Sequence, residues 1–91
     1  TLKEAGAPLV FASDWPVASV NPLRGLQAAI LRAPWAEGLP GQALALHEAL
    51  RAYTADAAHA QFMEDRKGSL RPGLLGDVVV LSGDIEATPP E

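Results

Sequence analysis

Asp14 is the residue in this chain best placed to do chemistry, because it is a carboxylate that follows a short apolar run. Leu9 to Ala12 are all apolar, which predicts a strand covered on both faces. Pro16 restricts its own φ and favours extended geometry before it, so we expect Asp14 to stand on a stiff loop. In a parallel α/β barrel the carboxyl ends of the strands carry the chemistry. A structural reading stays open, because aspartate also shapes turns and caps helices.

The two histidines are the other candidates for a metal site. His47 stands beside Glu48, and His59 follows in a later apolar segment, but neither belongs to an H-x-H or H-E-x-x-H pair. We therefore expect both to be surface or packing residues. The sequence also lacks a glycine-rich phosphate loop, a G-x-S-x-G elbow and any cysteine nucleophile. Common motifs thus complete no catalytic set.

The composition predicts that the chain needs further protein segments or subunits to fold stably. It has 91 residues, of which 48% are hydrophobic and 20% charged, and it contains no cysteine. A domain of this size has a thin core and usually adds disulfides or a metal. We expect a piece of a larger protein or a homo-oligomer.

Charge and hydropathy exclude several classes of partner. The net charge of -4 argues against nucleic acid and anionic membranes, which attract clustered Lys and Arg. No apolar run approaches the ~20 residues of a membrane span, and the start shows no signal-peptide pattern. The absence of cysteine fits a reducing compartment, so a cytoplasmic location is expected.

Three helices are predicted in the middle of the chain. Asn21 followed by proline is typical of a helix start, and apolar spacing extends that helix over 22–33, where Pro34 ends it. A glycine- and proline-containing loop follows. The second helix spans about 46–53, and Thr54 is expected to cap the third.

The two ends of the chain have different predicted character. Residues 1–6 fit the last turn of a helix, with Gly6 as a left-handed C-cap. Gly68 to Gly73 indicates a turn, and Asp77 to Ser82 is strongly strand-forming. The tail from Ile85 onward has no predicted partner within the chain.

Several segments carry more information together than singly. Taken together and in their order along the chain, the segments listed below make the sequence similar to the C-terminal region of the metal-dependent amidohydrolases. Within that superfamily the sequence resembles the family-3 group, which includes N-substituted formamide deformylase-like proteins. The similarity covers essentially all 91 residues, and its most specific motif is K-G-S-L-x-P-G…D-V-V-V-L. The family commonly has Lys and Ala where Leu74 and Gly76 stand. The segments are Ala12-Ser-Asp14-Trp-Pro-Val, Asn21-Pro22, Ala49-Leu-Arg-Ala-Tyr-Thr54, Glu64-Asp-Arg-Lys-Gly-Ser-Leu-Arg-Pro-Gly73 and Gly76-Asp-Val-Val-Val-Leu-Ser82.

The resemblance implies an α/β fold. Residues 1–66 would be the C-terminal part of a (β/α)8 TIM barrel, with strand eight and the helices after it. Residues 67–91 would supply strands of the flanking β-sandwich domain.

The resemblance also implies a role for Asp14. It matches the family's strand-eight aspartate, which binds or abuts a divalent metal, with zinc expected here. That residue takes a proton from the attacking water and passes it to the leaving group. The implied reaction is hydrolysis of a C–N bond in a small amide or formamide. The other metal ligands, including an H-x-H pair, would precede Thr1, so this chain alone is expected to be inactive.

Two other readings remain. The chain could be a non-catalytic association module that oligomerises through exposed barrel faces, because uncovered apolar faces and strand edges seek partners. It could also derive from a catalytically inactive homologue.

Overall fold

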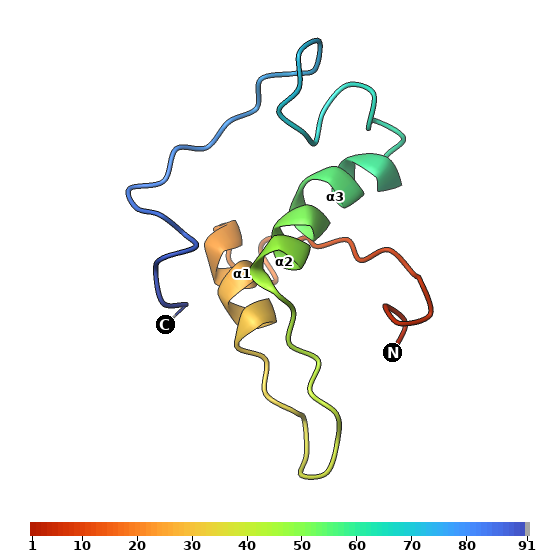
Figure 1. Ribbon diagram of the computed structural model, residues 1–91, viewed down its shortest axis with the longest axis vertical. Coiled ribbons are helices and arrows are strands. Elements are labelled where there is room, and N and C mark those ends of the chain that lie inside the picture. Colours follow the sequence, from red (N-terminus) through yellow and green to blue (C-terminus); the bar gives the residue numbers. More distant parts are fainter. Residues whose placement is uncertain (91) are drawn as a thin grey trace.

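The computed structural model describes residues 1–90, in which three helices lie at the centre and long irregular segments surround them (Figure 1). The helices are α1 (Pro22–Ile30), α2 (Leu46–Tyr53) and α3 (Ala55–Ala60). The radius of gyration is 14.5 Å, whereas a compact chain of this length has about 12 Å. The fold is therefore open, with a small packed centre.

Helix α1 begins as the sequence predicts and ends earlier. The Asn21 side-chain oxygen accepts a hydrogen bond of 3.0 Å from the Leu23 amide, and Pro22 occupies the first turn. The helix stops at Ile30 rather than at 33. Pro34 explains the difference, because in a continued helix its ring would clash with the Ile30 carbonyl, and it disfavours helical geometry in the residue before it.

Helices α2 and α3 follow one another with only Thr54 between them. At the start of α2, the Ala45 amide donates to Glu48 Oε2 at 3.0 Å, which satisfies one amide that lacks a partner in the helix. Thr54 occupies the N-cap position of α3, as predicted, but its side chain makes no capping hydrogen bond. Its hydroxyl instead donates to the Leu50 carbonyl at 2.8 Å, because φ -120° and ψ -90° are not the extended geometry of an N-cap.

The packed centre is small and rich in alanine. The buried apolar side chains of residues 1–90 are Leu26, Ala49, Ala52 and Ala58. Helix α2 packs against both α1 and α3. Gly25 allows a close approach, because a Cβ at this position would overlap the Tyr53 hydroxyl and the ring carbon that carries it. The small residues thus bring α1 and the end of α2 together.

The prediction of a barrel strand and sandwich strands is wrong for residues 1–90, which contain no β-strand. Strands need a neighbour whose backbone groups can pair with theirs. The Phe11 amide, inside the predicted first strand, instead donates to the Ala52 carbonyl at the end of α2, 3.1 Å away. The segment 77–82 lies in the open, with Val79 and Val80 82% and 90% exposed. Strand propensity is present in both places, but no partner strand is.

Glycines in a left-handed conformation stand in both the N-terminal turn and the turn after α3. Gly6 has φ +85°, its amide donates to the Lys3 carbonyl, and the Ala7 amide donates to the Leu2 carbonyl. The left-handed conformation of Gly6 is the one predicted from the sequence, but residues 2–6 form a turn, not the last turn of a helix. The Leu75 amide closes the later turn by donating to the Arg66 carbonyl at 2.8 Å. The division of the chain between residues 66 and 67 stays a prediction.

Candidate functional site

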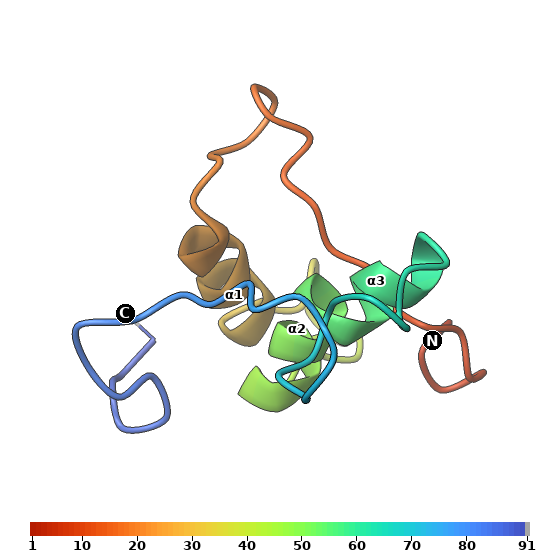
Figure 2. The ribbon, with the colours of Figure 1, turned by 90° about the horizontal axis from the view of Figure 1, so that it is seen from above.

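Asp14 lies in a tight turn on a loop that projects from the helices, between the N-terminal turn and α1 (Figure 2). Its φ is +48°, a left-handed conformation that aspartate tolerates better than most residues. The Val17 amide donates to the Asp14 carbonyl at 2.8 Å, and the Ala18 amide donates to the Ser13 carbonyl at 3.2 Å. The following Trp15–Pro16 bond is cis. The backbone of Asp14 therefore shapes a turn, while the residue as a whole is exposed.

The structure does not bring other metal ligands to Asp14. Among residues 1–90 no group of three or more His, Asp or Glu side chains could hold one ion. His47 and His59 stand on α2 and α3, and both are exposed. A protein metal site takes three or more protein ligands, so the part of the chain described here offers Asp14 as a single donor.

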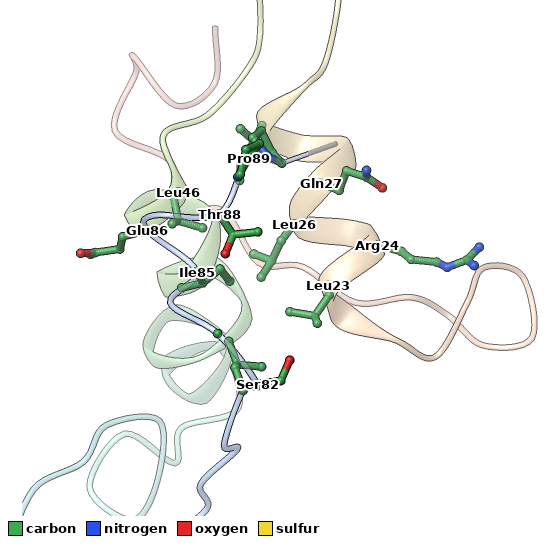
Figure 3. A pocket seen from close by; sticks show the side chains of 14 residues that line it. Leu23, Arg24, Leu26, Gln27, Leu46, Ser82, Ile85, Glu86, Thr88 and Pro89 are labelled. Carbon is green, nitrogen blue, oxygen red and sulfur yellow. The ribbon is translucent and has the colours of Figure 1, made fainter.

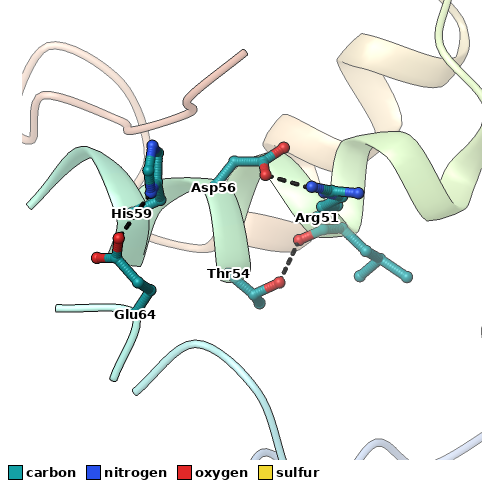
Figure 4. Close-up of polar contacts among 6 residues, drawn as sticks. Arg51, Thr54, Asp56, His59 and Glu64 are labelled. Carbon is teal, nitrogen blue, oxygen red and sulfur yellow. Dashed lines mark hydrogen bonds and ion pairs between the residues drawn. The ribbon is translucent and has the colours of Figure 1, made fainter. Parts of the chain in front are cut away.

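His59 has a partner that the sequence did not predict. Its Nδ1 lies 2.8 Å from Glu64 Oε1 (Figure 4). The Glu64 backbone amide and the His59 ring together hold the pKa of the Glu64 carboxyl below its usual value. Helical periodicity could not reveal this pair, because α3 ends at Ala60 and the chain turns back before Glu64. A neighbouring ion pair joins Arg51 Nε to Asp56 Oδ1 at 2.8 Å.

An apolar hollow of about 530 Å³ lies between the helices and the C-terminal segment (Figure 3). Leu23 and Leu26 line it from α1, Leu46 from α2, and Leu81 and Ile85 from the opposite side. The tail from Ile85 onward, for which the sequence predicts no partner, thus lines one side of this hollow. The helical spacing of the apolar residues in α1 and α2 is visible in the sequence, but the position of the tail opposite α1 is not. The hollow suits an apolar group and contains no cluster of acid–base side chains.

No helix within residues 1–90 has both the length and the apolar character needed to cross a membrane.

Comparisons with known proteins identify the lineage of the chain. The model of the amidohydrolase family matches residues 1–91. Protein LONG AFTER FAR-RED 3 of Arabidopsis thaliana is 41% identical over 85 residues, which are 90% of this chain and 15% of the relative. Putative amidohydrolase YtcJ of Bacillus subtilis (strain 168) is 34% identical over 95 residues, covering 99% of this chain and 18% of the relative.

A third relative is N-substituted formamide deformylase of Arthrobacter pascens, 31% identical over 86 residues, which cover 92% of this chain and 16% of the relative. No solved structure matches. The chain thus spans less than a fifth of the length of these curated relatives. Because the family model covers the chain from end to end, this protein belongs to the amidohydrolase family.

Proposed function

We propose that this chain is part of a metal-dependent hydrolase that cleaves C–N bonds in small amide or formamide substrates. The observation that carries the proposal is the match of the whole chain to the amidohydrolase family. Two relatives support it, since one is called a putative amidohydrolase and another an N-substituted formamide deformylase. The acidic net charge of -4 favours a small molecule over nucleic acid, and the lack of cysteine supports a cytoplasmic location.

Asp14 is the residue to which we assign chemistry. Because Asp14 is exposed and lies in a turn outside the packed helices, it can reach a group outside its own chain. There it would serve as one metal ligand and as the base that accepts a proton from the attacking water and delivers it to the leaving nitrogen.

The metal requirement exceeds what residues 1–90 contain. Zinc is the ion we expect, and when bound it lowers the pKa of a coordinated water to about 7. Asp14 alone does not make a site, because no second or third ligand lies with it in the part described. We therefore assign the completed metal site to a longer protein and expect the 91-residue chain to be inactive.

Titration of the isolated chain tests this assignment directly. Calorimetry with zinc or manganese should show no tight stoichiometric site, because one carboxylate cannot replace three or more ligands. A submicromolar site in the isolated chain would contradict the proposal.

A chimera tests the role of Asp14. Residues 1–91 would replace the matching part of N-substituted formamide deformylase, to which they are 31% identical, and deformylase activity and bound metal would be measured. Asp14→Asn keeps the shape of the side chain but removes the base, so kcat should fall by about 10²–10⁴-fold. Asp65→Asn, at an exposed carboxylate after α3, is the matched control and should leave kcat unchanged. Equal activity of both variants would refute the assignment.

Association is a second candidate function, favoured by the exposed apolar residues. Large hydrophobic side chains stay exposed along the chain, among them Val17 at 81%, Trp35 at 93% and Val80 at 90%. Where such side chains form a contiguous patch they mark an interaction site, and a homo-oligomer would cover it. Sedimentation of the chain distinguishes the two, since a monomer at all concentrations would exclude self-association.

A further inference from the structure

A polar hollow of about 420 Å³ lies where α2, α3 and the turn after α3 meet. Basic, acidic and hydroxyl side chains all line it, with one more positive than negative charge. The surplus is notable in a chain whose net charge is -4. Asp14 is not among its lining residues, so this hollow is separate from the residue to which hydrolysis was assigned. Its cations are Arg51, Lys67 and Arg71, and its carboxylates are Asp56 and Glu64.

The two carboxylates of the hollow are already paired. Asp56 Oδ1 accepts from Arg51 Nε at 2.8 Å, and Glu64 Oε1 lies 2.8 Å from His59 Nδ1 (Figure 4). Lys67 and Arg71 have no ion pair within residues 1–90. The positive charge of the hollow that has no ion-pair partner therefore lies on these two side chains, next to the hydroxyl of Ser69. With His59 counted as neutral, the Glu64 carboxylate offsets part of this charge and leaves the surplus of one.

Gly68 fixes two of these residues against α3. It has φ +94°, and a Cβ there would lie 2.6 Å from the Ala58 Cβ and 3.1 Å from the Thr54 carbonyl oxygen. The turn thus rests directly on the helix, with Lys67 and Ser69 on either side of the contact. The Lys67 amide also donates to the Met63 carbonyl at 3.0 Å. The K-G-S part of the most specific sequence motif accordingly places an ammonium and a hydroxyl at one hollow.

We propose that this hollow binds a small dianionic oxyanion of the phosphate class, either free phosphate or the phosphate group of a monoester. Lys67 supplies a point charge, Arg71 a planar guanidinium that matches two phosphate oxygens, and Ser69 a hydroxyl donor. Paired Asp56 and Glu64 hold Arg51 and His59 at the wall and leave the other two cations for the ligand. Binding would rest on charge-assisted hydrogen bonds. Because the site is open to solvent, the affinity for phosphate should fall as the salt concentration rises.

Nuclear magnetic resonance of the ¹⁵N-labelled 91-residue chain tests the proposal. Inorganic phosphate and methyl phosphate are titrated separately at constant ionic strength, and sodium chloride serves as the control titrant. We expect saturable shifts of the Lys67, Gly68 and Ser69 amides, with Kd on the order of 1 mM. Binding of both compounds identifies the phosphate group as the recognised feature, and binding of inorganic phosphate alone identifies a free-ion site.

Variants separate the hollow from general surface charge. Lys67→Ala combined with Arg71→Ala should weaken phosphate binding at least tenfold, whereas Arg32→Ala, which removes an exposed cation outside the hollow, should not change it. Shifts that do not saturate, that chloride reproduces, or that survive the double substitution would overturn the proposal. Such a result would leave the assignment of Asp14 intact, since the chimera test depends on different residues.

Discussion

The helical unit, residues 22–30 and 46–68, and the extended segments, residues 7–13 and 77–82, differ in how their backbone groups are satisfied. In the helical unit each helix bonds its own amides, and neighbouring segments complete its ends: the Leu44 amide donates to the Ala29 carbonyl and the Phe11 amide to the Ala52 carbonyl. The extended segments have no ladder. Helices close most of their hydrogen bonds within one segment, whereas strands require a second segment.

The difference also appears in burial. The buried side chains of the described residues all lie in the helical unit, at Leu26, Ala49, Ala52 and Ala58. Val78, Val79 and Val80 in the second extended segment are 60%, 82% and 90% exposed. Apolar side chains stabilise a fold only when it removes them from water. The helical unit should therefore dominate the stability of the chain, and the extended segments should contribute little.

Gly68→Ala should have the largest effect, because it attacks the helical unit by two routes at once. The new Cβ would need a left-handed backbone at φ +94° and would overlap the Ala58 Cβ. Together these should lower the free energy of unfolding by about 2–4 kcal/mol, measured by urea unfolding with circular dichroism. Gly73→Ala is the control, since φ is +92° but the space is open; it should cost only about 1 kcal/mol. Equal losses would show that the packing on α3 is unimportant.

Leu26→Ala compared with Val79→Ala measures the contrast between the two regions. Leu26 is 5% exposed, so its truncation leaves a cavity and should cost about 2–4 kcal/mol. Val79 is 82% exposed, so its truncation should stay within about 0.5 kcal/mol. The same unfolding measurement reads both. A loss at Val79 that matched the loss at Leu26 would mean that the segment 77–82 is covered in solution, as association would require.

Acid should produce the smallest effect, through the contact between the N-terminal turn and α2. The Lys3 ammonium, and then the Ala45 amide, hold the pKa of the Glu48 carboxyl below its ordinary value. The stabilisation is therefore complete above the ordinary pKa of glutamate, about 4.3, and is lost as pH falls through the lower folded-state pKa. Unfolding curves measured over this range should show a small acid-induced decrease, and Glu48→Gln should reduce it. An unchanged acid response in Glu48→Gln would rule out this contact as its source.

The candidate site was predictable only in part. Asp14 stands out in the sequence as a carboxylate after an apolar run, and the structure places it in an exposed turn. Whether it acts as a ligand or base depends on groups that do not approach it within residues 1–90. No pattern in the sequence predicts the polar hollow, because His59, Glu64 and Arg71 come together only when the chain reverses after α3. Sequence spacing reports neighbours along an element and is silent across such a reversal.

The sequence by itself determined the features that depend on short-range geometry and on lineage. These are the Asn21-Pro22 start of α1, the α2 span, the left-handed Gly6 and membership of the amidohydrolase family. Capping, φ restriction and apolar periodicity act over a few residues, so the local sequence contains them. Tertiary structure alone decided that the predicted strands stay unpaired and that the Phe11 amide bonds to α2. It also decided that Gly25 and Gly68 are contact points, because pairing and close approach depend on which distant segment arrives.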